Sequence, residues 1–93
     1  MSTEERAEGD FTVQSELGLH ARPAGRFVAV AGRFQSEVEV SRGEEWVSGT
    51  SVLSILSLAA AQGTVIKIKA VGVDAQRAVE ELGALIEAVD EGQ

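Results

Sequence analysis

The chain has 93 residues, 44% of them hydrophobic and 25% charged, which fits one domain with one core and leaves no room for a second. Its net charge of −7 argues against nucleic acid as a partner, because phosphate backbones are bound by clustered lysine and arginine. The absence of cysteine excludes disulfides and thiol redox chemistry.

The first ten residues differ in pattern from those that follow. Residues 1–10 are polar, charged and without periodicity, so a flexible N-terminal extension is expected there. Residues 11–17 alternate as in a half-buried strand, and Gly18 ends it. The inward side chains of this strand would be Phe11, Val13, Ser15 and Leu17. A single domain over residues 11–90 is expected, with residues 91–93 as a C-terminal tail.

A first helix is expected to follow this strand and to end near Gly32. Pro23 fits the first turn of a helix, where the N–H groups have no intrahelical acceptor. The helix therefore begins within a residue or two of His20. Its apolar face combines Ala24, Phe27, Val28 and Ala31.

The middle of the chain predicts a hairpin and a short helix. Residues 34–48 form two alternating stretches around a turn at residues 42–44. Thr50 or Ser51 can then cap a second helix that runs to about Ala60. This helix carries more apolar side chains than one buried face needs: Val52, Leu53, Ile55, Leu56 and Leu58.

The last part of the chain predicts a strand and a helix. Residues 64–71 alternate apolar side chains with lysines, and Gly72 ends the strand. Asp74 is expected to cap the last helix, whose apolar stripe is Ala75, Ala78, Val79, Leu82, Leu85, Ile86 and Val89. The order β-α-β-β-α-β-α, with alternating strands, predicts an α+β fold in which helices cover one sheet face and water the other.

Two long stretches of the chain contain no acidic residue. Residues 17–36 carry three arginines, and residues 49–73 carry Lys67 and Lys69. The two stretches could form one face that favours anions or acidic partners, or the pattern could be chance in a short chain.

His20, the only histidine, is the residue best suited to chemistry. A neutral imidazole has a free lone pair and can attack phosphorus without a separate base. Nearby N–H groups at a helix start, each worth about 0.3–1 kcal/mol, and the Arg22 guanidinium could then hold the phosphoryl oxygens. The residues alone leave open that His20 only caps the helix and that Arg22 is a surface arginine. One histidine without cysteine does not fit a transition-metal site.

No targeting or membrane-spanning segment is visible. No positively charged start precedes an apolar run. The longest apolar-rich stretch, residues 52–61, is far shorter than the roughly 20 residues that span a bilayer. A cytoplasmic protein without membrane insertion is expected.

Residues 18–24 read GLHARPA, which resembles the active-site signature of the histidine-containing phosphocarrier (HPr) family of the bacterial phosphoenolpyruvate-dependent phosphotransferase system. Residues 47–63 resemble its second helix and regulatory serine region, and residues 71–78 resemble the opening of its last helix. The resemblance covers about residues 11–89. It implies an open-faced two-layer sandwich with a four-stranded antiparallel sheet and three helices on one face.

The resemblance also implies a stoichiometric phosphocarrier with a transient phosphohistidine rather than an enzyme. His20 would accept phosphate through Nδ1 from phospho-enzyme I and donate it to IIA components of sugar permeases. Arg22 would steady the phosphoryl group, and the backbone N–H groups of Ala21 and Arg22 would bind its oxygens. No cofactor is implied, and a monomer is expected.

Partner docking in the family uses the first two helices. The residues expected to touch partners are Arg26, Phe27, Val52, Leu53 and Leu56, whereas Ile55 and Leu58 are expected in the core. Thr50 stands where many family members have lysine, and Ser54 where they have glycine or lysine. Ala29 and Gly32 stand at positions of the first helix where basic residues are frequent. The docking face is therefore less cationic than usual.

Ser51 matches a serine that a dedicated kinase phosphorylates in some bacteria. A phosphate there would add about −1.5 to −2 charge within the docking face, and the alternative for Ser51 is a helix cap alone. For the whole chain, the alternative is a regulatory or nitrogen-branch relative that acts mainly by protein binding. A small ligand-binding enzyme domain is disfavoured, because a chain of this size rarely offers a substrate pocket.

Overall fold

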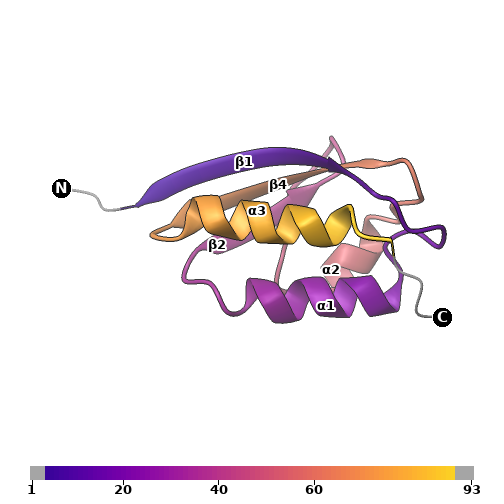
Figure 1. Cartoon of the computed structure of the whole chain (residues 1–93), viewed down its shortest axis with the longest axis horizontal. Coiled ribbons are helices and arrows are strands. Elements are labelled where there is room, and N and C mark those ends of the chain that lie inside the picture. Colours follow the sequence, from indigo (N-terminus) through magenta and orange to yellow (C-terminus); the bar gives the residue numbers. More distant parts are fainter. Residues whose placement is uncertain (1–3, 90–93) are drawn as a thin grey trace.

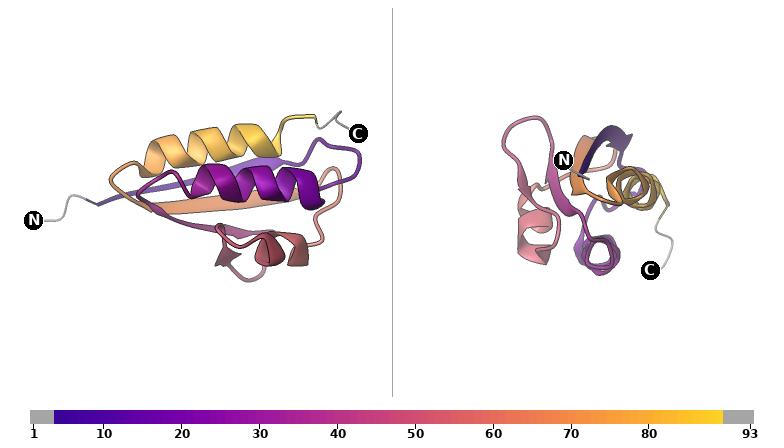
Figure 2. Two further views of the ribbon diagram at one scale, coloured as in Figure 1. Left: turned by 90° about the horizontal axis from the view of Figure 1, so that it is seen from below. Right: turned by 90° about the vertical axis from the view of Figure 1, so that its left-hand side faces the viewer.

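The computed structural model describes residues 4–89 and confirms the predicted order of elements (Figure 1). The elements are β1 (Glu5–Thr12), α1 (Ala21–Ala31), β2 (Glu37–Ser41), β3 (Val47–Ser48), α2 (Val52–Ser57), β4 (Val65–Gly72) and α3 (Ala75–Ile86). The four strands form one antiparallel sheet in the order β1-β4-β2-β3. The helices cover one face of this sheet, and α1 and α3 lie side by side (Figure 2). The open-faced α+β sandwich is therefore confirmed.

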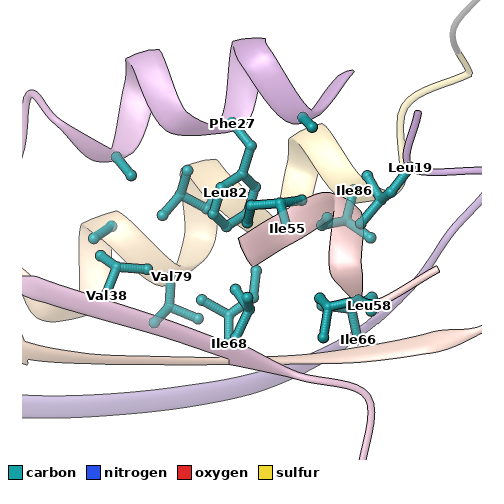
Figure 3. Close-up of a cluster of buried hydrophobic side chains, with 14 of the residues drawn as sticks. Leu19, Phe27, Val38, Ile55, Leu58, Ile66, Ile68, Val79, Leu82 and Ile86 are labelled. Atoms are coloured by element: carbon teal, nitrogen blue, oxygen red, sulfur yellow. The ribbon is translucent and has the colours of Figure 1, made fainter. Parts of the chain in front are cut away.

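The core lies between the sheet and the helices. Because side chains alternate along a strand, β4 buries Ile66, Ile68 and Ala70 against the helices and presents its two lysines on the open face. From the helical side, Phe27 of α1 and Leu82 of α3 are fully buried and point into the same cluster (Figure 3). These three elements, β4, α1 and α3, therefore contribute the faces that their periodicity predicts.

The first strand begins earlier than predicted. Residues 5–12 form β1 and pair along their whole length with β4, so the prediction of a flexible segment over residues 1–10 was wrong for residues 5–10. One of the charges that suggested disorder has an ion-pair partner across the sheet: Asp10 lies opposite Lys67, with 3.4 Å between Oδ2 and Nζ. Residues 1–3 lie outside the described residues.

The predicted strand over residues 11–17 was wrong beyond Thr12. Residues 13–20 form a loop that leads from β1 to α1. Leu17, which the alternation had placed inside, is 75% exposed. Val89, the last member of the predicted stripe, is also exposed, because α3 ends three residues earlier at Ile86.

Asp74 precedes α3 as predicted, but its side chain does not cap that helix. Its carboxylate instead accepts hydrogen bonds from the Gln35 N–H at 2.9 Å and from the Ser36 hydroxyl at 2.6 Å. These bonds, the one from Ser36 first, stabilise the charged form and hold the pKa of the Asp74 carboxyl below its ordinary value of 3.8. Asp74 therefore fastens the start of α3 to the segment between α1 and β2.

Replacement of Asp74 by Asn is expected to lower the stability of the protein at neutral pH. A depressed pKa contributes stability that is complete above the ordinary value of 3.8 and is lost as the pH falls below it. The difference in urea midpoint between the parent and Asp74→Asn should therefore shrink from neutral pH to about pH 3. Asp10→Asn, at an exposed ion pair, is the control. A difference that stays constant with pH would argue against this role of the carboxylate.

Candidate functional site

The loop that carries the only histidine is packed against the connection between α2 and β4. Within this loop, residues 13–20, the Leu19 N–H donates to the Ala60 carbonyl at 2.9 Å and the His20 N–H to the Gly18 carbonyl at 2.9 Å. Gly18 has φ +74°, and a Cβ at this position would overlap the Ala60 carbonyl oxygen. Only glycine fits this approach, so the residues just before His20 are fixed in place.

His20 occupies the N-cap position of α1, as the placement of Pro23 predicts. Its side chain makes no capping hydrogen bond to the first turn, which contradicts the alternative that the imidazole serves as a helix cap. The residue is partly exposed, while its Nε2 atom is buried. The ring thus turns Nε2 inward at the helix start.

Two arginines accompany this histidine on α1. Arg22 lies in the first turn and Arg26 one turn later, so both lie on one side of the helix, and both are exposed. Ala21, the first helical residue, is also exposed. The N–H groups of a first helical turn point out of the helix end and carry its positive dipole, so this end favours an anion.

The second helix lies beside the end of α1 that carries His20 (Figure 1). It is shorter than predicted, and Ser51 caps it by accepting a hydrogen bond from the Ser54 N–H at 3.2 Å. Ile55 and Leu58 are buried, as expected. The kinase-dependent role of Ser51 stays a prediction.

The predicted partner-binding residues separate into exposed and buried ones. Leu53 is 79% exposed, Val52 is 36% exposed, and Leu56 is partly buried against the core. Phe27 is fully buried, so its prediction as a partner contact was wrong: the side chain points toward the sheet (Figure 3). Sequence reasoning missed Leu17, whose exposure could have been suspected from the turn that Gly18 favours.

The two acid-free stretches are only partly on one face. The helices α1 and α2 do lie together, and neither has an acidic residue in its first turn. The two lysines, in contrast, lie on the open face of the sheet. Lys69 pairs with Glu39 at 3.4 Å and lies 4.2 Å from the centre of the Trp46 ring, and Lys67 pairs with an aspartate of β1. The cationic character around His20 therefore comes from arginines of α1.

None of the helices between residues 4 and 89 combines the length and the apolar character that crossing a membrane requires.

Comparison with known proteins agrees with this fold and shows the family of the chain. The family model described as "PTS HPr component phosphorylation site" matches residues 7–88. The phosphocarrier protein HPr of Haemophilus influenzae is 44% identical over 77 residues, which cover 83% of this chain and 91% of that protein. The phosphocarrier protein HPr of Pseudomonas aeruginosa is 39% identical over 89 residues, which cover 90% and 96%.

A solved structure and a larger relative extend the comparison. The crystal structure of a phosphocarrier protein HPr from Bacillus anthracis has a TM-score of 0.84 at 34% identity and covers 88% of this chain and 98% of that one. The multiphosphoryl transfer protein of Haemophilus influenzae is 38% identical over 88 residues, 91% of this chain but 18% of that protein. The fold and the site thus define a small phosphocarrier of the phosphotransferase system. The chain belongs to the HPr family.

Proposed function

We propose that His20 receives the phosphoryl group through Nδ1 from phospho-enzyme I and passes it to IIA components of sugar permeases, in the cytoplasm. The observation that carries this proposal is the place of the imidazole, at the N-cap of α1 with Nε2 buried and no capping bond. In the transfer step, the Nδ1 lone pair forms a bond to phosphorus. The bond between phosphorus and the donor breaks, and its electron pair stays with the donor.

The surroundings of His20 suit reversible binding of a phosphoryl group. The dianion would lie at the positive end of α1, where the backbone N–H groups of Ala21 and Arg22 begin the helix. Contacts of this kind contribute about 0.3–1 kcal/mol each, and the exposed Arg22 guanidinium adds a charged donor. These contacts stabilise the phosphohistidine less than a metal clamp would, so the group can move on to an acceptor.

The docking surface that fits this transfer is apolar next to His20 and cationic along α1. Leu53 and Val52 of α2 provide exposed apolar area, and Arg26 provides positive charge. Leu17, in the His20 loop itself, adds a third exposed apolar side chain. Such a surface fits a partner that presents apolar side chains surrounded by acidic ones.

A labelled transfer assay tests this proposal. The protein is incubated with enzyme I and radiolabelled phosphoenolpyruvate, and a IIA component is then added. We expect an acid-labile label, one group per chain, that moves to the IIA component. A protein that takes no label, or whose label resists acid, would refute the proposal. If the label forms but does not move to the IIA component, the proposal that a IIA component is the acceptor is refuted, and another branch of the same system is favoured.

Replacement of Leu53 by Asp is expected to slow phosphoryl transfer without unfolding the protein. Leu53 is 79% exposed, so the fold does not depend on it, whereas a carboxylate there would repel an acidic partner. The loss in kcat/KM for transfer from enzyme I should be about 10- to 100-fold. Val73→Asp, at an exposed valine near the start of α3, is the matched control and should transfer normally. Equal losses in both variants would show that this face of α2 is not the docking surface.

A further inference from the structure

The connection between α2 and β4, residues 58–64, supports the His20 loop along its length. Four hydrogen bonds join the two segments: Val13 N–H to Thr64 O at 2.9 Å, Gly63 N–H to Val13 O at 2.9 Å, Gln62 Nε2 to Gln14 O at 3.0 Å and Leu19 N–H to Ala60 O at 2.9 Å. The last of these acceptors, the Ala60 carbonyl, holds Leu19, the residue next to His20. The position of the imidazole therefore depends on where the Ala60 carbonyl points.

The residue before Ala60, Ala59, has an unusual backbone conformation. Among residues 4–89, Ala59 is the one residue other than glycine with a positive φ, +50°. This left-handed conformation is less favourable for alanine than for glycine, because the Cβ approaches the following carbonyl oxygen. Something outside Ala59 must therefore stabilise it.

Arg42, in the segment between β2 and β3, bonds the two carbonyls that flank the Ala59 Cα. Its Nη1 donates to the Leu58 carbonyl at 3.1 Å and lies 3.4 Å from the Ala59 carbonyl. Consecutive carbonyls point to opposite sides in an extended chain and to similar sides in a helical or left-handed one. One nitrogen that reaches both carbonyls thus selects against an extended Ala59.

We propose that Arg42 is a positioning residue for phosphoryl transfer: it keeps Ala59 left-handed, so that the Ala60 carbonyl holds Leu19 and, through it, His20. The proposal rests on the proposed role of His20. Arg42 itself does not touch the phosphoryl group. It acts through two carbonyls of the α2–β4 connection and one backbone hydrogen bond of the His20 loop.

Amide hydrogen exchange of Arg42→Ala tests the structural part of this inference. The Leu19 amide should exchange about tenfold faster than in the parent, while the Ile68 amide, in the middle of the central strand β4, should keep its rate. Phosphoryl acceptance should slow by about 3- to 30-fold, because small displacements of a reacting group are costly. The control is Arg77→Ala, which removes the same charge from an exposed ion pair on α3 and should change neither rate.

A second substitution separates positioning from a general loss of stability. In the Arg42→Ala background, Ala59→Gly should restore both the protection of Leu19 and the transfer rate, because glycine adopts the left-handed conformation without help. The control is Gly32→Ala, in a right-handed position at the far end of α1, which should stabilise the chain by about as much as Ala59→Gly does. It should restore neither the protection of the Leu19 amide nor the transfer rate. Rescue by both substitutions, or by neither, would overturn the proposal, as would an unchanged Leu19 amide in Arg42→Ala.

The two proposals fail in different ways. If the parent protein takes no phosphoryl group, the proposed function is wrong, and the exchange of Leu19 still reports whether Arg42 positions the loop. If the parent transfers normally and Arg42→Ala does so too, only the role of Arg42 is refuted.

Discussion

His20→Ala is expected to take no phosphoryl group from phospho-enzyme I and to remain folded. The chain has no second histidine, so no other imidazole can form the intermediate. The residue is partly exposed, so the loss of its side chain should change the free energy of unfolding by less than about 1 kcal/mol. Labelled transfer and urea unfolding measure the two quantities on the same preparations.

Gln62→Ala serves as the control for His20→Ala. Gln62 is exposed and bonds the carbonyl of Gln14 in the same loop, so its loss tests whether any change near the loop stops transfer. We expect this variant to accept the label. If His20→Ala still takes the label, His20 is not the acceptor. If the His20→Ala variant is much less stable than the parent, the histidine has a structural role.

Phe27→Ala is expected to cause the largest loss of stability among the substitutions proposed for this chain. Phe27 is fully buried between α1 and the sheet, and removal of a core phenylalanine typically costs about 3–5 kcal/mol. That is a large part of the about 5–15 kcal/mol that stabilises a small domain. The urea midpoint should fall accordingly, with the unfolding slope unchanged.

Two further variants make the Phe27 result decisive. Phe34→Ala, at a partly buried ring near Arg77, should cost much less. If Phe27→Ala does not fold, Phe27→Leu should still fold and lose about 1–2 kcal/mol. Normal stability together with slow transfer in the Phe27 variants would contradict the buried position and support a partner contact instead.

Much of this architecture follows from local patterns. The alternation of Ile66, Ile68 and Ala70 predicts β4, and Pro23 predicts where α1 begins. These features were predictable because hydrophobic periodicity and the residue preferences of a helix N-terminus depend on residues that are close in sequence. The same local chemistry predicts the place of His20 at the start of α1, and the structure confirms it.

The errors arose where the deciding contact is distant in sequence. The charged residues of β1 looked like a solvated tail, because the lysine that pairs with Asp10 lies 57 residues away. Asp74 bonds Ser36 rather than its own helix, across a separation of 38 residues. For Phe27, the amphipathic pattern of α1 does not tell which apolar side chains face the core and which face a partner. Packing against the sheet places Phe27 in the core.

The position of the phosphoryl group on the imidazole ring tests the central claim most directly. Nitrogen and phosphorus NMR of the protein labelled with ¹⁵N and phosphorylated by enzyme I would identify the ring nitrogen that is bonded to phosphorus. Because Nε2 is buried at the start of α1, we expect the bond at Nδ1 of His20. A bond at Nε2, or a phosphoryl group on any other residue, would contradict the account.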